Sequence, residues 1–533
     1  MTARLWTCAL VCGLACSSHG EAFGGGGAST NGLSNCITAA QEREVHEKLI
    51  EFAASQPGIA SPIPLPQQYR FQPIAGTLWQ DRHILNFYDV DFSTGIRDWD
   101  CSQFTYNNHN ATDIVIRGFG EQDAGVPLFA VLDGVVALAH DGENDRNTTL
   151  EGQPANYVII HHGNTHYTWY WHLRKGSVAV VVGQPVTAGT QIGQVGSSGH
   201  SEAPHVHFQS EFQGGSYETY SGPCYPGPRH WLNQLAIPRH TWISDFGMHN
   251  RLTVLTQNFY PHDPPRAGTF VRTGAPQPIG AWYVIHNEQP NTVWRARYLR
   301  PNGTVGFDPG ARLRSNAFNR FAAWWFAFSF DPDTSGTWTM ELTVNDQVLV
   351  TAPFLVLDGG SVPANRPPRT PTAAVFDPSM PDPRDPLFCR LTVPLPQDFD
   401  YDLVSYEYHW LINGLSYRKV TNAAFADAIP RGVASATDSV RCIVTPYDGR
   451  QFGTPIMAQL NDSAPVLRIR RITGNRVELS WPTSVLDYVL QAKGNLSPAT
   501  PWATAGQPVR SGSRMFATNT ISTSTRFYRL KWP

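Results

Sequence analysis

The chain has 533 residues and a formal net charge of −3, and charged residues make up 16% of it. A chain of this length is too long to fold around a single hydrophobic core, so three or four domains are expected. The sequence has no basic excess to neutralise a nucleic-acid backbone and no block of like charge typical of a solvated tail. Its 45 Gly, 42 Pro and 12% aromatic residues favour short strands joined by turns.

Residues 1–20 have the pattern of a signal peptide for export. Arg4 precedes an apolar run from Leu5 to Cys16, which is too short for a permanent anchor, and small or polar residues follow. The alternative is a lipoprotein signal in which Cys16 carries lipid, although Gly13 stands where that signal normally has an aliphatic residue. We therefore expect an exported protein that is periplasmic, cell-surface or secreted and has no membrane span.

The rest of the chain divides into a series of segments. Residues 21–80 form a pro-like segment with one helix at 37–54, in which Val45, Leu49 and Phe52 share a face. Short apolar runs broken by Gly, Asn and Asp predict a compact antiparallel β-domain at residues 81–240. The segments that follow are a β-domain at 245–358, a Pro- and Gly-rich linker at 359–371, and two β-domains at 372–463 and 465–533.

The two C-terminal segments resemble known β-sandwiches. Cys389, Trp410 and Cys442 follow the order found in immunoglobulin-like domains, where an inter-sheet disulfide packs on a tryptophan. That resemblance implies a Cys389–Cys442 disulfide, and residues 465–533 resemble a small fibronectin-type-III-like domain. Of the other cysteines outside the signal peptide one is left over, and the sequence does not tell which. These are Cys36, Cys101 and Cys224.

Three short motifs in the first β-domain carry the residue types of a metal site. They are His109-Asn110-Ala111-Thr112-Asp113, Tyr170-Trp171-His172-Leu173 and His205-Val206-His207-Phe208, the last preceded by a glycine-rich run at 193–199. The H-x-x-x-D pair alone arises easily by chance among 18 histidines, a lone Y-x-H is typical of a half-buried strand, and the H-x-H is the stronger signal. Their order, spacing and flanking glycines together favour a single site.

The chemistry of these side chains predicts metal-assisted hydrolysis. Because side chains alternate along a strand, His205 and His207 would share a face, roughly 7 Å apart. A catalytic zinc site uses three protein ligands, from imidazole or carboxylate groups, and keeps a fourth position open. Two histidines and one aspartate fill the three positions, and two more histidines remain to move protons.

With these motifs, residues 105–212 resemble the lysostaphin-like (LytM-type) zinc endopeptidases of bacterial cell walls. The resemblance extends through the segments 130–136, 156–160 and 186–193. It implies that Zn²⁺ is held by His109, Asp113 and His207, and that His172 and His205 are the catalytic histidines. The implied substrate is the peptide part of peptidoglycan, either a stem-peptide cross-link or a glycine-rich bridge.

The sequence departs from the family pattern at Asn110-Ala111, at Glu202-Ala203, and in a polar loop insertion at 141–154. These departures could alter substrate fit and leave the ligand set intact. We interpret three nearby histidines as structural residues, and the aromatic run at 324–328 as a buried strand in preference to a sugar-stacking platform. The three are His161, His162 and His166.

The expected fold class is mainly β, with a lysostaphin-like antiparallel metallopeptidase domain followed by β-sandwiches of Ig-like and fibronectin-III-like type. The expected function is zinc-dependent hydrolysis of peptidoglycan cross-links. Three alternatives stay open: a non-catalytic wall-binding or hydrolase-activating protein, an adhesive surface protein, and a secreted peptidase of glycine-rich proteins. The sequence leaves undecided the scissile bond, the oligomeric state, and whether residues 21–80 block the site.

Overall fold

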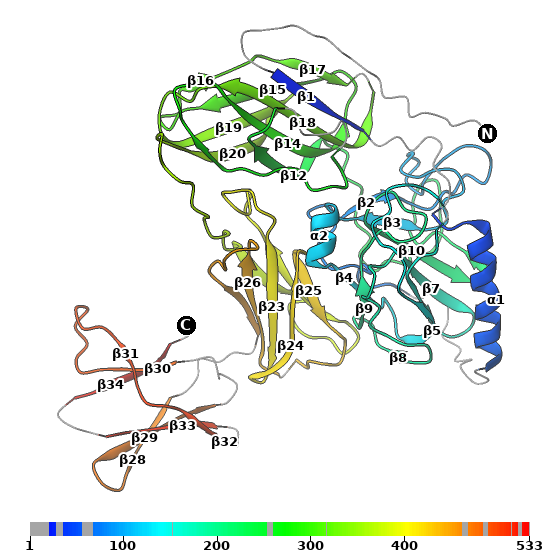
Figure 1. The fold of residues 1–533 in the computed structure, drawn as a ribbon. Coiled ribbons are helices and arrows are strands. Elements are labelled where there is room, and N and C mark those ends of the chain that lie inside the picture. The colour runs from blue at the N-terminus through cyan, green and yellow to red at the C-terminus, as the bar shows by residue number, and fades with distance from the viewer. Residues whose placement is uncertain are drawn as a thin grey trace.

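The computed structural model describes residues 21–27, 36–55, 68–151, 153–252, 259–315, 317–436, 438–460, 467–482, 489–512, 514–520 and 525–531. In these ranges the structure has two helices, α1 (Ala39–Ser55) and α2 (Phe119–Ala124), and is otherwise built from strands (Figure 1). The mainly β fold class is thus confirmed. Neither helix has the length and hydropathy of a bilayer span. The predicted signal peptide and the lipidation site at Cys16 lie outside the described residues.

One antiparallel sheet carries all three sequence motifs. Its strand order is β2-β3-β10-β7-β6-β5-β8, with β11 paired to the end of β10, while β4 and β9 form a separate pair. The bounds are β2 (His83–Asn86), β3 (Thr112–Val115), β4 (Pro127–Phe129), β5 (Gly134–His140), β6 (Tyr157–His161), β7 (His166–Trp171), β8 (Pro185–Val186), β9 (Gln191–Gln194), β10 (His205–Phe212) and β11 (Gly215–Ser216).

The two faces of this sheet pack against different partners. Tyr170, Val206 and Phe208 point into the main core of the domain. Because side chains alternate across a strand, the neighbouring Trp169 and Trp171 point to the opposite face, where they pack with α1. The helix predicted at 37–54 is confirmed, and it buries the expected face of Val45, Leu49 and Phe52.

The second domain is a sandwich of two sheets. One has the order β1-β18-β14-β12, and the other β13-β20-β19-β15-β16 with β17 on β15. The aromatic run at 324–328 lies in β18 with Phe326 and Phe328 fully buried, which confirms a buried strand. The bounds are β1 (Glu21–Gly27), β12 (Trp242–His249), β13 (Thr269–Val271), β14 (Gln277–Glu288), β15 (Thr292–Leu299), β16 (Val305–Phe307), β17 (Arg312–Ser315), β18 (Asn319–Phe330), β19 (Gly336–Val344) and β20 (Gln347–Leu357).

Two further pairs of sheets follow. The third domain pairs the sheet β21-β22-β25 with β24-β23-β26-β27, and the fourth pairs β28-β29-β33-β32 with β31-β30-β34. The bounds are β21 (Ala373–Asp377), β22 (Leu387–Thr392), β23 (Ser405–Ile412), β24 (Leu415–Asn422), β25 (Ala426–Ile429), β26 (Val440–Tyr447), β27 (Ile456–Leu460), β28 (Arg468–Ile472), β29 (Arg476–Pro482), β30 (Val489–Lys493), β31 (Ala503–Thr504), β32 (Val509–Ser511), β33 (Arg514–Thr520) and β34 (Phe527–Lys531).

The cysteines pair differently from the expectation. Cys101 and Cys224 form a disulfide in the first domain. The expected Cys389–Cys442 disulfide is wrong, because both residues are buried free thiols in the core of the third domain. Burial, together with a hydrogen bond to Cys389, raises the pKa of the Cys442 thiol well above its usual value. Burial therefore suppresses the thiolate that oxidation requires. Cys36 is the cysteine left over, and it too is a buried thiol.

The first domain is packed against its neighbours. Phe71 and Phe129 meet Phe388 of the third domain in a shared apolar cluster. Arg431 of the third domain also forms an ion pair with Asp133. The second domain contacts the first along β2, beside the predicted metal site. The domain that holds the motifs is therefore packed against two β-sandwiches (Figure 1).

Candidate metal centre

The strand register brings the central residues of the site into one row across the sheet. Asn86 on β2 lies opposite Asp113 on β3, Asp113 lies opposite His207 on β10, and His207 lies opposite Trp171 at the end of β7. His205 and His207 share the face that the strand alternation predicts, because Val206 between them enters the main core. Residues nearly a hundred positions apart in the sequence are neighbours for this reason.

The three predicted ligands have the spacing of a tetrahedral metal site. Nε2 of His109 is 3.2 Å from Oδ2 of Asp113, and Nδ1 of His207 is 3.1 Å from Oδ1 of Asp113. Zinc bonds of about 2.0–2.2 Å in a tetrahedron place ligand atoms about 3.3–3.6 Å apart. All three side chains are at most 2% exposed. The structure therefore brings together the side chains that the sequence motifs predict as ligands.

The hydrogen bonds around His109 leave one nitrogen free to bind a cation. Nδ1 of His109 is 2.7 Å from the carbonyl oxygen of Phe87, so Nδ1 carries the proton and donates it. Nε2 then has a lone pair, and within the described part of the chain this buried atom makes no hydrogen bond. A histidine that binds zinc through one ring nitrogen commonly donates the N–H of the other to a backbone carbonyl, as Nδ1 of His109 does here.

The carboxylate of Asp113 is ionised in this setting. Burial would raise its pKa, but His109 and His207 hold the pKa of Asp113 well below its usual value. Asn86 adds a hydrogen bond from Nδ2 to Oδ2 of Asp113, with the two atoms 2.9 Å apart. One buried carboxylate and two imidazoles fit the ligand set of a Zn²⁺ ion.

The two predicted catalytic histidines lie together beside these ligands. The rings of His172 and His205 are 4.5 Å apart, and His172 is 6.0 Å from the ring of His207. Nδ1 of His172 donates to the carbonyl oxygen of Ser198 at 2.6 Å, and Nδ1 of His205 donates to that of Ala203 at 2.8 Å. Each ring therefore keeps an unprotonated Nε2 that can accept a proton.

The backbone reaches these positions through one unusual conformation and one close approach. His172 has a φ of 69°, a left-handed conformation that is costly for a residue with a side chain, and β7 ends at Trp171 just before it. Alternation along a strand therefore does not explain where His172 lies. Gly196 accepts the hydrogen bond from the backbone nitrogen of His205, and a Cβ on Gly196 would lie 2.5 Å from the nitrogen of Arg174. Only glycine permits that close approach.

A fourth donor at the site was not predicted. Sγ of Cys36 lies 3.9 Å from Oδ2 of Asp113 and 3.8 Å from Nε2 of His205. The ligand atoms of Cys36, His109, Asp113 and His207 all lie within 4.8 Å of one another. One feature of the sequence could have pointed to this donor. An odd number of cysteines outside the signal peptide leaves one without a disulfide partner, in a chain that also has a metal motif.

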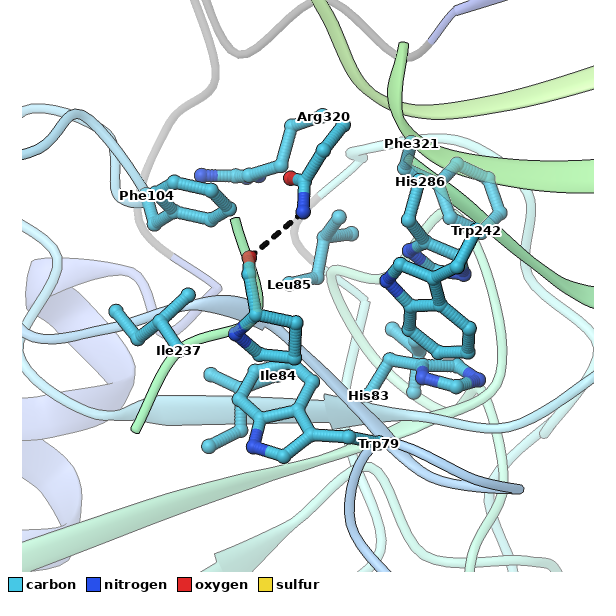
Figure 2. Close-up of a pocket in the computed structure, with 13 residues that line it drawn as sticks. Trp79, His83, Ile84, Leu85, Phe104, Ile237, Trp242, His286, Arg320 and Phe321 are labelled. Atoms are coloured by element: carbon cyan, nitrogen blue, oxygen red, sulfur yellow. Dashed lines mark hydrogen bonds between the residues drawn. The ribbon is translucent and has the colours of Figure 1, made fainter. Parts of the chain in front are cut away.

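The outer shell of the site extends into the second domain. Arg320 on β18 donates from Nη2 to Oδ1 of Asn86 at 2.9 Å, and its guanidinium lies 4.9 Å from the ring of Phe104. Figure 2 shows Arg320 over Phe104 in the pocket between the two domains, where His83 of β2 packs on Trp242 and His286. Burial lowers the pKa of Arg320 to about 9, so the side chain is still a cation at neutral pH.

The polar loop at 141–154 borders the site. Thr149 bridges to Ser201, which lies four residues before His205, and Arg146 bridges to Ser197. The loop thus supports the turn that presents His205.

The three histidines interpreted from the sequence as structural residues make contacts away from the proposed ligands. His162 lies between the carbonyl oxygen of Asp133 and the hydroxyl of Thr168, each at 2.7 Å. Burial lowers the pKa of His162 to about 3. His166 contacts the hydroxyls of Tyr69 and Tyr217 at 3.2 and 3.0 Å. His161 packs on the ring of Tyr167 at 4.8 Å.

Comparison with known proteins finds a family model that matches the part of the chain that carries the site. Residues 107–218 match the model of Peptidase family M23. Peptidoglycan DD-endopeptidase ShyA of Vibrio cholerae is 38% identical over 101 residues, which cover 19% of this chain and 20% of that protein. Glycyl-glycine endopeptidase ALE-1 of Staphylococcus capitis is 33% identical over 116 residues, which cover 22% of this chain and 28% of that protein.

A solved structure is also similar. The catalytic domain of the antimicrobial peptidase lysostaphin from Staphylococcus simulans has 23% sequence identity and a TM-score of 0.17, over 26% of this chain and 88% of that domain. The chain spans less than a third of the length of the two curated relatives. The family match concerns the part of the chain around the site, since residues 107–218 match the model of Peptidase family M23.

Proposed function

We propose that the protein is a zinc-dependent endopeptidase that hydrolyses peptide bonds in peptidoglycan cross-links. The observation that carries the proposal is the meeting of His109, Asp113 and His207 at ligand spacing, with a buried Nε2 on His109 that makes no hydrogen bond and faces Asp113. The family match over residues 107–218 supports it. A non-catalytic relative would have little need for this complete donor set with two further histidines beside it.

His109, Asp113 and His207 would hold the zinc. When bound, zinc acts as a Lewis acid that polarises a scissile carbonyl and favours ionisation of water. Nε2 of His172 and Nε2 of His205 are the proton acceptors nearest to the ligands, because each ring donates through Nδ1 to a backbone carbonyl. The pair would take a proton from the attacking water and deliver one to the leaving amine.

The substrate class comes from the relatives. Their names identify a DD-endopeptidase and a glycyl-glycine endopeptidase, so a stem-peptide cross-link and a glycine bridge are both in the range of related sites. Both bonds join units of peptidoglycan. We propose peptidoglycan as the substrate and leave the choice between the two bonds to the assay.

Such a substrate requires export, and we propose that the protein acts in the periplasm, at the cell surface or outside the cell. The Cys101–Cys224 disulfide supports this location, since disulfides persist in oxidising compartments. The signal-like residues 1–20 support it independently. The third and fourth domains, proposed as Ig-like and fibronectin-III-like modules, would then be extracytoplasmic.

The test is incubation of purified peptidoglycan with the zinc-loaded protein, with and without a chelator, followed by mass spectrometry of the released peptides. Chelator-sensitive release of free amino and carboxyl termini at a cross-link is expected. Peptidoglycan with stem-peptide cross-links and peptidoglycan with glycine bridges are assayed side by side. If no form of the chain, including a Cys36→Ser variant, releases peptides from either material, the proposed function is wrong.

A further inference from the structure

We propose that the thiolate of Cys36 is a fourth ligand of the metal and that residues 36–55 hold the peptidase in a latent form. The latency rests on the peptidase function proposed above. The assignment of Cys36 as a ligand rests on geometry alone and does not depend on the substrate. A catalytic zinc site keeps its fourth position for water or substrate, whereas a site closed by a fourth protein ligand has the form of a structural one.

The sulfur of Cys36 lies where a fourth ligand belongs. Its distance of 3.9 Å to Oδ2 of Asp113 is close to the edge of about 3.6 Å expected when zinc binds sulfur at about 2.3 Å and oxygen at about 2.1 Å. The sulfur also lies within 4.8 Å of the ligand atoms of His109 and His207. Cys36 is also within 4.8 Å of the nitrogen atoms of His172 and His205. The thiol thus lies between the ligands and the catalytic histidines, where the attacking water and the scissile carbonyl would have to enter.

Local contacts fix this position. The hydroxyl of Tyr106 accepts a hydrogen bond from the backbone nitrogen of Cys36 at 3.2 Å and lies 3.1 Å from its sulfur. The ring of Tyr106 in turn lies 4.4 Å from that of His109. Tyr106 therefore connects the cysteine to a metal ligand.

A capping box attaches Cys36 to α1. The side chain of Gln41 accepts hydrogen bonds from the backbone nitrogen and the hydroxyl of Thr38, both at 2.9 Å, and the backbone nitrogen of Gln41 donates to the hydroxyl of Thr38 at 3.3 Å. This reciprocal arrangement starts a helix at a defined residue. The cysteine two residues upstream is consequently held at the end of a rigid element.

The helix covers the sheet face that carries the catalytic groups. Val45, Leu49 and Phe52 bury their side chains with Trp169 and Trp171, which share a face with His205 and His207. Figure 1 shows α1 lying along the sheet that contains β5, β7 and β10. A peptide that approached the metal along this face would have to displace α1.

Polar contacts hold both edges of the helix. His46 of α1 is 3.1 Å from Oε2 of Glu211 on β10, and Gln41 donates from Nε2 to the carbonyl oxygen of Gln153 at 2.9 Å. Gln153 belongs to the polar loop at 141–154 that departs from the family pattern. The loop insertion thus gives α1 a second support beside the site.

Burial of the site agrees with a closed state. His109, Asp113, His172 and His207 are at most 2% exposed, and His205 is 7% exposed. A substrate the size of a peptidoglycan peptide requires an open groove, and residues 36–55 are the element that fills it. Removal of this segment from the sheet face would expose the histidines and vacate the position of the sulfur in one movement.

The experiment measures zinc–sulfur bonding and hydrolysis in the full chain. In the zinc-loaded parent, X-ray absorption at the zinc edge is expected to show one sulfur neighbour at about 2.3 Å beside nitrogen and oxygen neighbours at about 2.0–2.2 Å. The sulfur contribution is expected to vanish in Cys36→Ser and to remain in Cys389→Ala, which removes a buried thiol in the core of the third domain. Peptidoglycan hydrolysis is expected to rise in Cys36→Ser on the order of tenfold or more.

A second variant separates the ligand from the helix. Leu49→Asp places a charge in the apolar contact of α1 and leaves every proposed ligand in place, so it is expected to weaken the sulfur signal and to raise hydrolysis. A parent without a zinc–sulfur signal, or a signal that persists in Cys36→Ser, overturns the proposal. Equal hydrolysis by the parent and both variants overturns latency. A sulfur signal that depends on Cys36 supports the ligand assignment even if no variant cleaves peptidoglycan, in which case the proposed function is what fails.

Discussion

Arg320 donates a hydrogen bond from Nη2 to Oδ1 of Asn86, and the two atoms are 2.9 Å apart. Asn86 in turn donates a hydrogen bond from Nδ2 to Oδ2 of Asp113, with the two atoms 2.9 Å apart. The two partners fix the amide in one orientation, since a cation needs the oxygen and a carboxylate needs the nitrogen. A residue of the second domain therefore orients Asp113, a proposed metal ligand of the first.

Replacement of Arg320 by Ala is expected to weaken zinc binding about 10- to 100-fold, the usual effect of losing an outer-shell partner. Asn86 would lose the contact that holds its amide toward Asp113. Zinc affinity is measured by competition with a chelator of known affinity. Arg471→Ala, an exposed arginine in the fourth domain, is the control and should bind zinc as the parent does. Equal affinity in Arg320→Ala would show that the second domain does not act on the site.

Replacement of His207 or His205 should separate metal binding from catalysis. His207→Ala removes a ligand and is expected to lose stoichiometric zinc. His205→Ala is expected to retain zinc but to lose hydrolysis by about 10²–10⁴-fold, the usual contribution of a general acid or base. Zinc content is measured by atomic emission after gel filtration, and hydrolysis on peptidoglycan in a Cys36→Ser background. Full activity in His205→Ala would remove it from the mechanism.

The stability of the first domain should fall as the pH is lowered from 7 to 5, in part because of His162. The unfolded state takes up a proton on this residue below about pH 6.5, whereas burial lowers the pKa in the folded state to about 3. The unfolded state therefore binds more protons between these two values, and the free energy of unfolding decreases as pH falls through that range. The contribution of His162 is about 2 kcal/mol between pH 7 and pH 5.

Urea unfolding of the chelated protein at both pH values, compared between the parent and His162→Asn, checks this expectation. Between pH 7 and pH 5 the free energy of unfolding should fall by about 2 kcal/mol less in the variant than in the parent, whatever the stability of the variant at pH 7. The same pH dependence in both proteins would mean that His162 is protonated equally in the folded and unfolded states.

The Cys101–Cys224 disulfide should contribute strongly to the stability of the site domain. It joins residues 123 positions apart, and cross-links over loops of this length are expected to stabilise by about 2–5 kcal/mol. The paired variant Cys101→Ser with Cys224→Ser should therefore show a lower urea midpoint. That paired variant is not expected to respond to reductant, whereas Cys389→Ser keeps the disulfide and should lose stability on reduction as the parent does. A parent whose midpoint is the same with and without reductant would contradict this.

The local patterns of the sequence predicted much of this architecture. Val45, Leu49 and Phe52 repeat at helical spacing, so their buried face follows from the sequence alone. His205 and His207 flank an apolar residue in a strand, which places both on one face. Both features depend on the spacing of residues within one helix or one strand, so they can be predicted from the sequence.

Other features depend on contacts that local patterns do not encode. His172 reaches the site through a left-handed backbone conformation beyond the end of β7. The contact of Arg320 with Asn86 joins two domains, and the residue pattern of neither segment predicts it. The expected Cys389–Cys442 bond failed for a related reason, since the order of residues along strands places two sulfurs close together without deciding their oxidation state.

The strand β1 also sets an order of assembly. It pairs along residues 322–328 of β18, so its partner emerges roughly 300 residues downstream of it. The strands on which α1 packs, β5 to β7, are synthesised much earlier than β18. Closing the shorter loop to them also costs less entropy. During synthesis or export Cys36 and α1 can therefore settle on the first domain before β1 has a sheet to join. The docking of β1 then ties the N-terminal segment to a second domain, so a single cut in the segment would leave both pieces bound to the folded chain.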